Sequence, residues 1–308
     1  MRIRDLVLAA AVSALLAGPA LAAEPLVDAA WLRDNLKNPD VVVLDVRDDE
    51  KDSAALFAAG HIPGAIHSDY AKAGWRTKVN DVPGMLPPVA SLEALVGGLG
   101  IGNDDHVVVV SHGKSSTDFG AAARVLWTLE VLGHENVSVL EGGHKGWADA
   151  GLPVETGPAA ARDVALYAAT PRLELVVGRD EVKAAVESGR VPLVDARPVA
   201  QFLGAEVPPA VGVAGTLPGA VSLEHPKLVV NGNDVIDRAA LDALLAEVGL
   251  ANEGEVIAFC NTGHWASVGW FLLNKVGGND EARLYDGSMV EWVKTPGAPV
   301  VAGVVRAN

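Results

Sequence analysis

The segment Val-Val-Leu-Asp-Val-Arg at residues 42–47 recurs in the second half of the chain as Val-Pro-Leu-Val-Asp-Ala-Arg at residues 191–197. Three other segments recur in the same order: residues 60–65 at 215–220, residues 107–111 at 256–260, and residues 140–143 at 285–288. The spacing between each segment and its copy is almost constant, which is typical of a duplicated domain. The sequence therefore predicts two homologous domains in tandem.

Each copy alternates apolar runs with segments of helical periodicity. The predicted strands are Val41–Val46, Val107–Val110, Leu193–Val194 and Val256–Phe259, and the predicted helices are Ser91–Leu99 and Asp237–Val248. The second and fourth strands are apolar without alternation, as expected of strands covered on both faces. The predicted fold class is α/β, with a mostly parallel sheet flanked by helices in each domain.

Length and charge narrow the range of functions. The chain has 308 residues, which corresponds to two domains at about 150 residues each. It carries 24 Lys and Arg against 39 Asp and Glu, a net charge of −15. Nucleic acid is not an expected partner, because binding it needs basic residues that displace counterions from phosphates. A single cysteine excludes an internal disulfide.

The first 22 residues have the pattern of a secretory signal. A basic start, Met1–Arg4, precedes the apolar run Leu6–Gly18 and the small-residue cleavage pattern Pro19–Ala22. The run is shorter than the roughly 20 residues of a membrane span, and no later stretch is long enough, so no membrane partner is expected. We expect cleavage after Ala22 and, in a bacterial cell, a periplasmic protein; a buried N-terminal helix is the alternative. The predicted organisation is a signal peptide at 1–22, a first domain at 23–155, a linker at 156–171 and a second domain at 172–308.

Cys260 is the candidate nucleophile. It follows the predicted strand Val256–Phe259 and opens a short loop before a helical stretch that runs to about Lys275. Such a connection aims several backbone N–H groups at one point, where the helix dipole also favours an anion. Gly263 supplies the conformational freedom that the loop needs. A thiol placed there is expected to be a nucleophilic thiolate; the alternative is an inert buried cysteine.

The first copy has no comparable nucleophile. Ser111 stands where the second copy has Cys260, and His112 follows it. A hydrolytic Ser–His pair is disfavoured, because adjacent strand residues point to opposite faces and no third member is evident. The remaining histidines lack the spacing of a metal site, and no glycine-rich phosphate motif is present, so we expect no metal and no cofactor.

The motif Asp-x-Arg is present in both copies, as Asp45 with Arg47 and as Asp195 with Arg197. One of these copies lacks the cysteine, which argues against a catalytic role for the motif. We expect a structural Asp–Arg pair that ties the strand end to a neighbouring loop.

On these residues the chain resembles the two-domain rhodanese-like sulfurtransferases, the thiosulfate and 3-mercaptopyruvate sulfurtransferases, over essentially all of residues 23–308. The matching features are Asp-x-Arg at 45–47 and 195–197, His-Ile-Pro-Gly-Ala at 61–65, Tyr-Asp-Gly-Ser at 285–288 with Glu291 and Trp292, and Cys260 opening a six-residue loop. The resemblance implies that Cys260 takes a sulfane sulfur from a small-molecule donor and becomes a persulfide, whose charge the loop amides hold. The sulfur then passes to a thiol, a cyanide-like acceptor or an acceptor protein.

The loop departs from both branches of that family. Thiosulfate-type members have two basic residues after the cysteine and mercaptopyruvate-type members have Gly-Ser, whereas this chain has Asn261 and Thr262. Gln201 stands where the family has a substrate-binding arginine. If His264 is protonated, it would replace part of the positive charge that the missing basic residues supply. Alternatively, His264 is a solvent-exposed residue at the start of the helix. Trp265 either lines the pocket or packs in the core. Trp270 is expected to pack in the core. The residues expected to bind substrate are Asn261, Thr262, Gly263, His264 and Trp265.

His61 has a second interpretation through the same resemblance. In mercaptopyruvate-type enzymes a proton relay has been proposed from a loop hydroxyl through this histidine to an upstream acid. Thr262, His61 and either Glu50 or Asp49 would be its members here. Alternatively, His61 only shapes the first domain.

The predicted function is that of an exported sulfurtransferase with Cys260 as its nucleophile and a donor of the thiosulfate or 3-mercaptopyruvate class. The alternative is a persulfide carrier or binding protein that uses the same loop without turnover. A rhodanese-like phosphatase is disfavoured, because phosphate binding there needs an arginine six residues after the cysteine, where this chain has Ala266.

Overall fold

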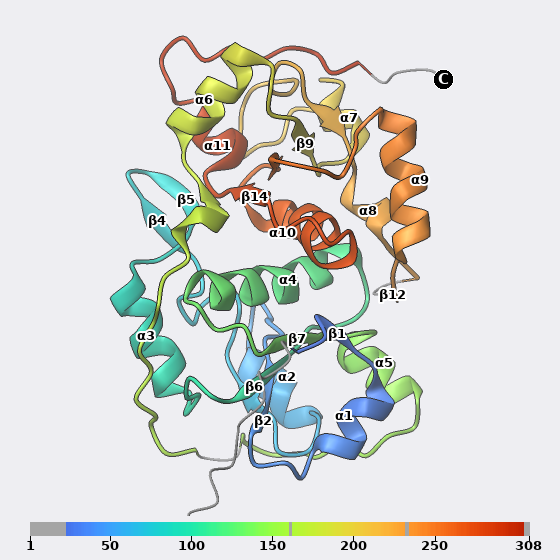
Figure 1. The fold of residues 1–308 in the computed structure, drawn as a ribbon. Coiled ribbons are helices and arrows are strands. Elements are labelled where there is room, and N and C mark those ends of the chain that lie inside the picture. The colour runs from blue at the N-terminus through green and yellow to red at the C-terminus, as the bar shows by residue number, and fades with distance from the viewer. Residues whose placement is uncertain (1–22, 160–161, 232–233, 305–308) are drawn as a thin grey trace, which may run out of the picture.

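Figure 1 shows two α/β domains, one above the other, in a computed structural model that describes residues 23–159, 162–231 and 234–304. The predicted signal peptide, residues 1–22, lies outside the described residues. Among the helices in the described ranges, none has the length and apolar character needed to cross a membrane.

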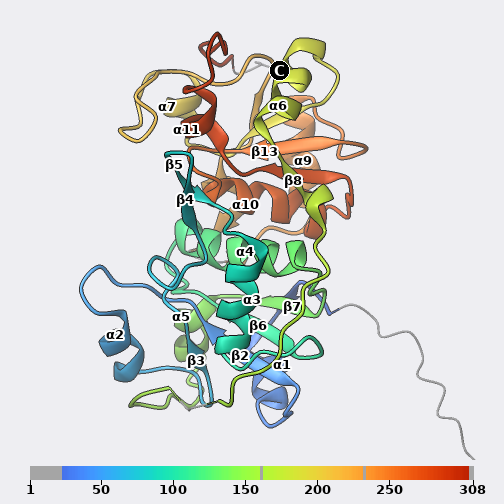
Figure 2. The same ribbon diagram turned by 90° about the vertical axis from the view of Figure 1, so that its left-hand side faces the viewer.

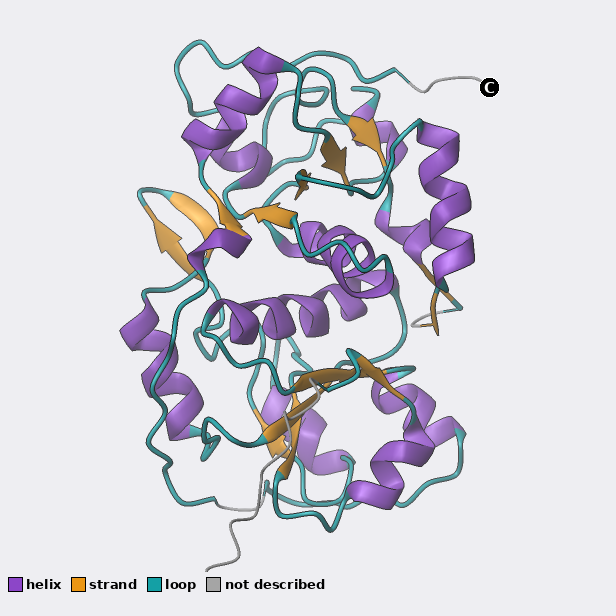
Figure 3. Cartoon of the chain, in the orientation of Figure 1, coloured by secondary structure: helices purple, strands orange, loops and turns teal. Residues whose placement is uncertain are grey.

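The first domain forms the lower half of the molecule in Figure 1. Its elements are β1 (Leu26–Val27), α1 (Ala29–Asn35), β2 (Val41–Asp45), α2 (Ser53–Ala59), β3 (Ile66–His67), β4 (Thr77–Val79), β5 (Val82–Met85), α3 (Val89–Gly98), β6 (His106–Val110), α4 (Ser116–Val131), β7 (Val137–Leu140) and α5 (Gly143–Asp149). Figure 3 shows helices on both sides of its strands.

The second domain repeats this order with local differences. Its elements are the 3-10 helix η1 (Leu173–Leu175), β8 (Val176–Val177), α6 (Arg179–Ser188), β9 (Leu193–Asp195), α7 (Val199–Phe202), β10 (Val221–Ser222), α8 (His225–Leu228), β11 (Val229–Val230), β12 (Asp234–Val235), α9 (Arg238–Val248), β13 (Val256–Phe259), α10 (His264–Phe271), the π-helical turn η2 (Leu272–Val276), β14 (Ala282–Tyr285) and α11 (Ser288–Trp292). The helix predicted after Cys260 is therefore α10 continued by η2.

Each domain contains a five-stranded parallel sheet, which confirms the predicted α/β duplication. The strand order is β1-β7-β6-β2-β3 in the first domain and β10-β9-β13-β14-β8 in the second. β6 and β13 are the central strands, and their last residues pair with the motif aspartates Asp45 and Asp195. Ser111 and Cys260 follow these strands at the carboxyl edge of each sheet, the edge where open α/β sheets bind ligands.

Local sequence explains where the predicted helices begin. α9 starts at Arg238 and not at Asp237, because the Asp237 side chain accepts a hydrogen bond from the Ala240 N–H at 2.8 Å and so caps the helix. α3 starts at Val89, two residues before the predicted start, directly after Pro88. Proline has no N–H to donate, so its place just before a helix leaves no donor unpaired.

α4 and α10 pack against each other between the two sheets (Figures 1 and 2). The rings of Phe119 and Phe271 meet edge to face with centroids 5.2 Å apart. The Ser267 hydroxyl donates to the Gly120 carbonyl at 3.1 Å. Both helices are apolar on nearly all sides, as expected of helices covered by protein all round. The domain interface is thus part of the hydrophobic core.

The hairpin β4–β5 of the first domain reaches the second domain. Figure 2 shows it at the level of α11. The Leu86 N–H donates to the Asp286 carboxylate at 2.6 Å, and the Lys294 ammonium donates to the Asp81 carbonyl at 2.6 Å. Val82 packs in the apolar cluster of the second domain. The first domain therefore supplies part of the wall around the second domain's loop.

The connection between α5 and η1 contains no helix or named strand in its described residues, 150–159 and 162–172. It includes most of the predicted linker, 156–171. The Ala165 N–H donates to the Gly97 carbonyl at 3.0 Å, and Tyr167 is buried. The described part of the connection therefore packs along the first domain.

Candidate active site

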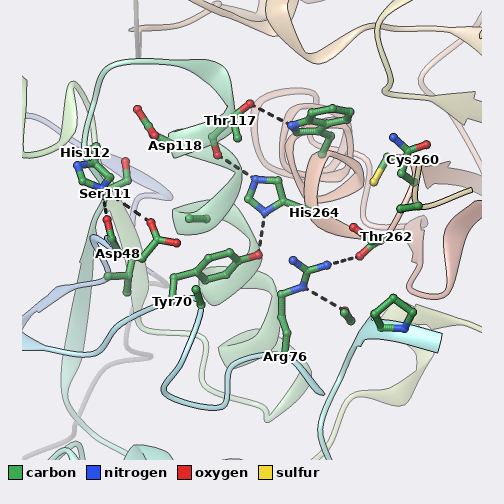
Figure 4. Close-up of a pocket in the computed structure, with 18 of the residues that line it drawn as sticks. Asp48, Tyr70, Arg76, Ser111, His112, Thr117, Asp118, Cys260, Thr262 and His264 are labelled. Atoms are coloured by element: carbon green, nitrogen blue, oxygen red, sulfur yellow. Dashed lines mark hydrogen bonds and ion pairs between the residues drawn. The ribbon is translucent and has the colours of Figure 1, made fainter. Parts of the chain in front are cut away.

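A cavity of about 770 Å³ lies between the domains, at the ends of the two central strands. Cys260, Thr262, His264 and Trp265 line it from the second domain. The first domain contributes Asp48, Tyr70, Arg76, Ser111 and His112, among others. Figure 4 labels all of these side chains except Trp265. The duplication therefore brings the strand-end loops of both copies to one pocket.

The Cys260 loop is held on α11 by backbone hydrogen bonds. The carbonyls of Cys260 and Asn261 accept the N–H groups of Met289 and Val290, both at 3.0 Å. In the first copy, Ser111 and His112 make the same two bonds to the residues after Gly143. The loop position is thus a property of the duplicated fold and does not depend on the cysteine.

Ser288 organises the inner side of this loop. Its hydroxyl accepts the N–H groups of Cys260 and Gly263, each at 3.1 Å, and donates to the Tyr285 carbonyl at 2.9 Å. Ser288 has a left-handed backbone (φ 47°), which is uncommon for a non-glycine residue. Two of the N–H groups expected to face the sulfur are therefore occupied by a hydroxyl.

The N–H groups of Asn261 and Thr262 remain available. Among the described residues, no acceptor is hydrogen-bonded to either of them. They precede the first turn of α10, whose dipole adds positive potential at the same point. Cys260 is 1% exposed, but it lines the pocket. An anion formed on its sulfur would therefore have peptide donors beside it.

Gly263 is required by the geometry of the loop. Its φ is +75°, a left-handed conformation. A Cβ at this position would lie 2.6 Å from an Arg124 guanidinium nitrogen and 2.7 Å from the Asp286 carbonyl oxygen. Only glycine satisfies both the backbone angle and the close approach.

Two arginines from the first domain contact the loop. Arg76 donates from Nη2 to the Thr262 carbonyl at 2.6 Å and from Nε to the Gly84 carbonyl at 3.1 Å. No carboxylate in the described part of the chain forms a salt bridge with it. Arg124, by contrast, pairs with Asp286 at 2.6 Å with both side chains buried. Arg76 therefore brings an uncompensated positive charge to the pocket.

His264 is held in its neutral form. Its Nε2 faces the Thr117 carbonyl at 3.0 Å, and its Nδ1 faces the Tyr70 hydroxyl at 2.8 Å. A carbonyl only accepts, so Nε2 carries the hydrogen, and the Tyr70 O–H donates to Nδ1. Burial, together with the nearby Arg76 charge, lowers the pKa of His264 to about 3. The expectation that a protonated His264 replaces the missing cations is therefore wrong; Arg76 supplies the charge.

Trp265 and Trp270 have different surroundings. Trp265 lines the pocket, stacks on His225 with centroids 4.4 Å apart, and donates from Nε1 to the Thr117 hydroxyl at 3.1 Å. Trp270 is fully buried and donates to the Ala282 carbonyl at 3.0 Å. Trp265 thus forms a pocket wall, and Trp270 belongs to the core.

Asn261 lines the pocket, but its side-chain amide is hydrogen-bonded within the protein. Its Nδ2 donates to the Gln201 side-chain oxygen at 2.9 Å, and its Oδ1 accepts from Arg197 at 3.4 Å. Gln201 is buried and is not among the pocket-lining residues. Where the family resemblance predicts a substrate-binding arginine, this chain has a glutamine that hydrogen-bonds to its own Cys260 loop.

The two Asp-x-Arg motifs have the same geometry. Arg197 pairs with Asp195 at 2.6 Å and also donates to the Gly215 carbonyl at 2.8 Å. Arg47 pairs with Asp45 at 2.7 Å and donates to the Gly60 carbonyl at 2.8 Å. Each arginine ties a strand end to the loop that begins the repeated Gly-x-x-Pro-Gly-Ala segment.

His61 does not lie beside the Cys260 loop. Its Nδ1 contacts the Phe57 carbonyl at 3.0 Å, its ring stacks on Phe57, and its Nε2 is 4.0 Å from the Glu155 carboxylate. It is buried in the first domain and does not line the pocket. The relay from Thr262 through His61 to Glu50 or Asp49 is therefore not formed, because the histidine's contacts are made within its own domain.

Comparison with known proteins agrees with this architecture. The family model of the rhodanese-like domain matches residues 28–150 and 178–295. A Mycobacterium tuberculosis protein named "Putative thiosulfate sulfurtransferase" is 33% identical over 286 residues, 90% of this chain and 98% of its own. "Thiosulfate/3-mercaptopyruvate sulfurtransferase 1, mitochondrial" of Arabidopsis thaliana is 30% identical over 302 residues, 90% of this chain and 78% of its own.

The solved structure of SseA from Escherichia coli, described among the 3-mercaptopyruvate sulfotransferases, aligns with a TM-score of 0.74 at 27% identity. The alignment covers 86% of this chain and 98% of SseA. The chain belongs to the rhodanese-like family, with two domains of that fold. Within the family it is a sulfurtransferase.

Several site residues were not found by sequence reasoning. Arg76, Tyr70 and Asp48 come from loops of the first domain and carry no motif of their own. Ser288 stood inside a recognised motif, but its hydroxyl contacts follow only from the folded loop. Arg76 directly precedes β4, and no repeated segment marks its position in the sequence.

Proposed function

We propose that the protein moves a sulfane sulfur from a donor of the thiosulfate or 3-mercaptopyruvate class to a thiophilic acceptor through a persulfide on Cys260. One arrangement carries this proposal: Cys260 follows the central strand of the second sheet and lines a pocket that also contains the free cation of Arg76. The names of the relatives supply the donor classes.

The proposed chemistry has two steps. The Cys260 thiolate attacks the outer sulfur of the donor, and the bond from that sulfur to the rest of the donor breaks with its electron pair on the departing group. The product is an anionic persulfide on Cys260. An acceptor thiolate or cyanide then attacks the outer sulfur, and the Cys260 thiolate departs unchanged.

The surroundings of Cys260 suit the charge in both steps. The persulfide anion would lie beside the N–H groups of Asn261 and Thr262, at the start of α10. Arg76 would bind the anionic part of the donor, since its guanidinium has no carboxylate partner among the described residues. These donors are already in place, which is what electrostatic stabilisation requires.

The test is mass spectrometry of the purified protein after incubation with thiosulfate or with 3-mercaptopyruvate. Wild type should gain the mass of one sulfur atom on Cys260 and should transfer it repeatedly to cyanide or a thiol. Cys260→Ser should gain none, and Arg190→Gln, which changes an exposed residue outside the pocket, should still load. If no sulfane donor loads Cys260, the proposal fails. A single stoichiometric loading without turnover would instead identify a persulfide carrier.

We further infer export to the periplasm of a bacterial cell. The basic start, the apolar run and the small-residue site at residues 1–22 support this. Expression of the full chain followed by cell fractionation should yield a periplasmic protein that begins at Ala23. A cytoplasmic protein that keeps Met1 would contradict the inference.

A further inference from the structure

The pocket has a second polar end, far from Cys260. Figure 4 shows Asp48, Ser111 and His112 together on one side of the view and Cys260 on the other. Arg76 and His264 lie between the two ends. The far end is built from the strand-end loop of the first domain, the copy of the Cys260 loop that lacks a thiol.

Ser111 has an unused hydroxyl at this end. It is 1% exposed and lines the pocket, and its Oγ has no hydrogen-bond partner among the described residues. A buried polar group without a partner costs about 1–3 kcal/mol. Most buried polar groups in proteins are paired, so a hydroxyl without a partner in a residue that lines a cavity is a candidate for binding a ligand there.

His112 lines the pocket next to Ser111 (Figure 4), because both residues follow the end of β6 and the alternation of strand side chains no longer applies. Its Nε2 faces the Asp48 carbonyl at 2.8 Å, and the Asp48 carboxylate lies 3.8 Å away. A carbonyl only accepts, so Nε2 carries a hydrogen. Within the described residues, no hydrogen bond uses Nδ1, and the side chain is 18% exposed. Protonated His112 therefore has one N–H free to donate.

The charges around His112 favour its protonated form. Hydrogen bonding to Asp48 raises the pKa of His112 against the effect of burial, and Asp118 raises it further. The Lys114 charge on the same loop opposes this, and His144 is the other titratable neighbour. The same contact lowers the pKa of the Asp48 carboxyl, so His112 and Asp48 form an ion pair, and the Asp118 carboxylate also lines the pocket.

The pocket is larger than a small donor needs. Its volume of about 770 Å³ falls within the roughly 300–1,000 Å³ of sites that enclose drug-sized ligands. A small inorganic donor or cyanide beside Cys260 would leave the Ser111 end empty. The space and its polar end fit a longer molecule whose reactive sulfur lies at one end and whose charged group lies at the other.

We propose that Ser111 and His112 bind a carboxylate at the far end of an organic thiol that serves as the sulfur acceptor. This assignment rests on the proposed function, because the thiol of that molecule must reach the persulfide on Cys260. The first-domain copy of the loop is then a binding site for substrate, whereas the second-domain copy is the reactive one.

The test uses matched acceptors of increasing length: straight-chain mercaptocarboxylic acids and the mercaptoalcohols of the same length. Protein loaded with thiosulfate is mixed with each thiol, and kcat/KM for sulfur transfer is measured. The acid should exceed the alcohol by about tenfold at one chain length, the value of one charge-assisted hydrogen bond. Shorter acids should show no such preference.

Substitutions at Ser111 and His112 show which side chain is responsible for the preference for the acid over the alcohol. His112→Gln should bring the acid-to-alcohol ratio close to one, and Ser111→Ala should lower it by a smaller factor. Lys114→Gln is the matched control, since it removes a positive charge from the same loop but does not line the pocket. Its ratio should not fall, because the Lys114 charge opposes protonation of His112. Calorimetry of Cys260→Ser with the sulfur-free acid of the preferred length gives a binding readout independent of turnover.

The outcomes separate the two proposals. A ratio that does not depend on chain length, or that persists in both His112→Gln and Ser111→Ala, overturns the carboxylate site while leaving the sulfurtransferase function intact. Failure of every sulfane donor to load Cys260 in wild type defeats the function itself, before any acceptor is added.

Discussion

The Arg76 guanidinium in the first domain donates a hydrogen bond of 2.6 Å to the Thr262 carbonyl in the Cys260 loop of the second. The same side chain donates to the Gly84 carbonyl in its own hairpin, so it links the two domains at the pocket. The domain without a thiol therefore completes the site of the domain that has one. In the proposed function, Arg76 would supply the positive charge that the Cys260 loop itself lacks.

Arg76→Gln should lower kcat/KM for an anionic donor by about 10- to 100-fold, because a hydrogen bond to a charged group contributes about 1.5–3 kcal/mol. The loss should be smaller for transfer to a neutral acceptor measured from preloaded protein. Arg190→Gln, which changes an exposed arginine outside the pocket, is the control. Equal rates for Arg76→Gln and wild type would show that Arg76 does not bind the donor.

Ser288→Ala should lower the free energy of unfolding by about 1–3 kcal/mol, since it leaves two loop N–H groups and one carbonyl without their partner. Loading of Cys260 with sulfur should slow as well, because the loop loses the hydrogen bonds that hold the N–H groups of Cys260 and Gly263. Chemical denaturation and stopped-flow loading measure the two effects. Ser91→Ala, on the exposed face of α3, should change neither; an unchanged midpoint for Ser288→Ala would contradict the assigned role.

Gly263→Ala and Gly254→Ala form a matched pair. Both glycines have a left-handed backbone, with φ of 75° and 68°. Alanine at either position should lower the free energy of unfolding by about 1–2 kcal/mol, because a residue with a Cβ disfavours that conformation. Only at Gly263 does the new Cβ also meet Arg124 and Asp286, so Gly263→Ala should be the less stable variant and should lose sulfur loading. Equal thermal midpoints for the two variants would mean that crowding at the loop is relieved at no cost.

The stability of the protein should fall as the pH drops below about 6.5, partly through His264. Its pKa is lowered to about 3 in the folded state, from about 6.5 when unfolded. Between these values the unfolded chain binds a proton that the folded chain does not, so up to about 1.4 kcal/mol is lost per pH unit. His264→Gln should reduce this slope in urea titrations between pH 6.5 and 4.

His112→Gln provides a control of opposite sign. Hydrogen bonding to Asp48 raises the pKa of His112 in the folded state. The contribution of His112 to the free energy of unfolding is therefore complete below about pH 6.5, and it is lost as the pH rises through the pKa of the folded state. The difference in unfolding free energy between wild type and His112→Gln should therefore shrink at alkaline pH. Parallel pH profiles for the two histidine variants would contradict both assignments.

Much of the fold could be predicted because it rests on local patterns. The continuous apolar runs before Ser111 and Cys260 are central parallel strands, as their composition indicated. The Asp-x-Arg motifs pair within three residues, so their contacts needed no tertiary information. The proton relay through His61 could not be predicted correctly, because it depends on a contact between distant parts of the chain. The motif identifies the histidine, but it does not indicate which loop the histidine contacts in the folded protein.

The sequence by itself determined the duplication, the order of strands and helices, and the place of Cys260 at the end of a strand, because periodicity and repetition are properties of neighbouring residues. Tertiary structure alone decided the electrostatics of the pocket. Arg76 reaches Thr262 across 186 positions of the chain, and His264 is neutral because Tyr70 and Thr117 enclose it. Charge and protonation depend on what surrounds a group in space, and those surroundings come from the other domain.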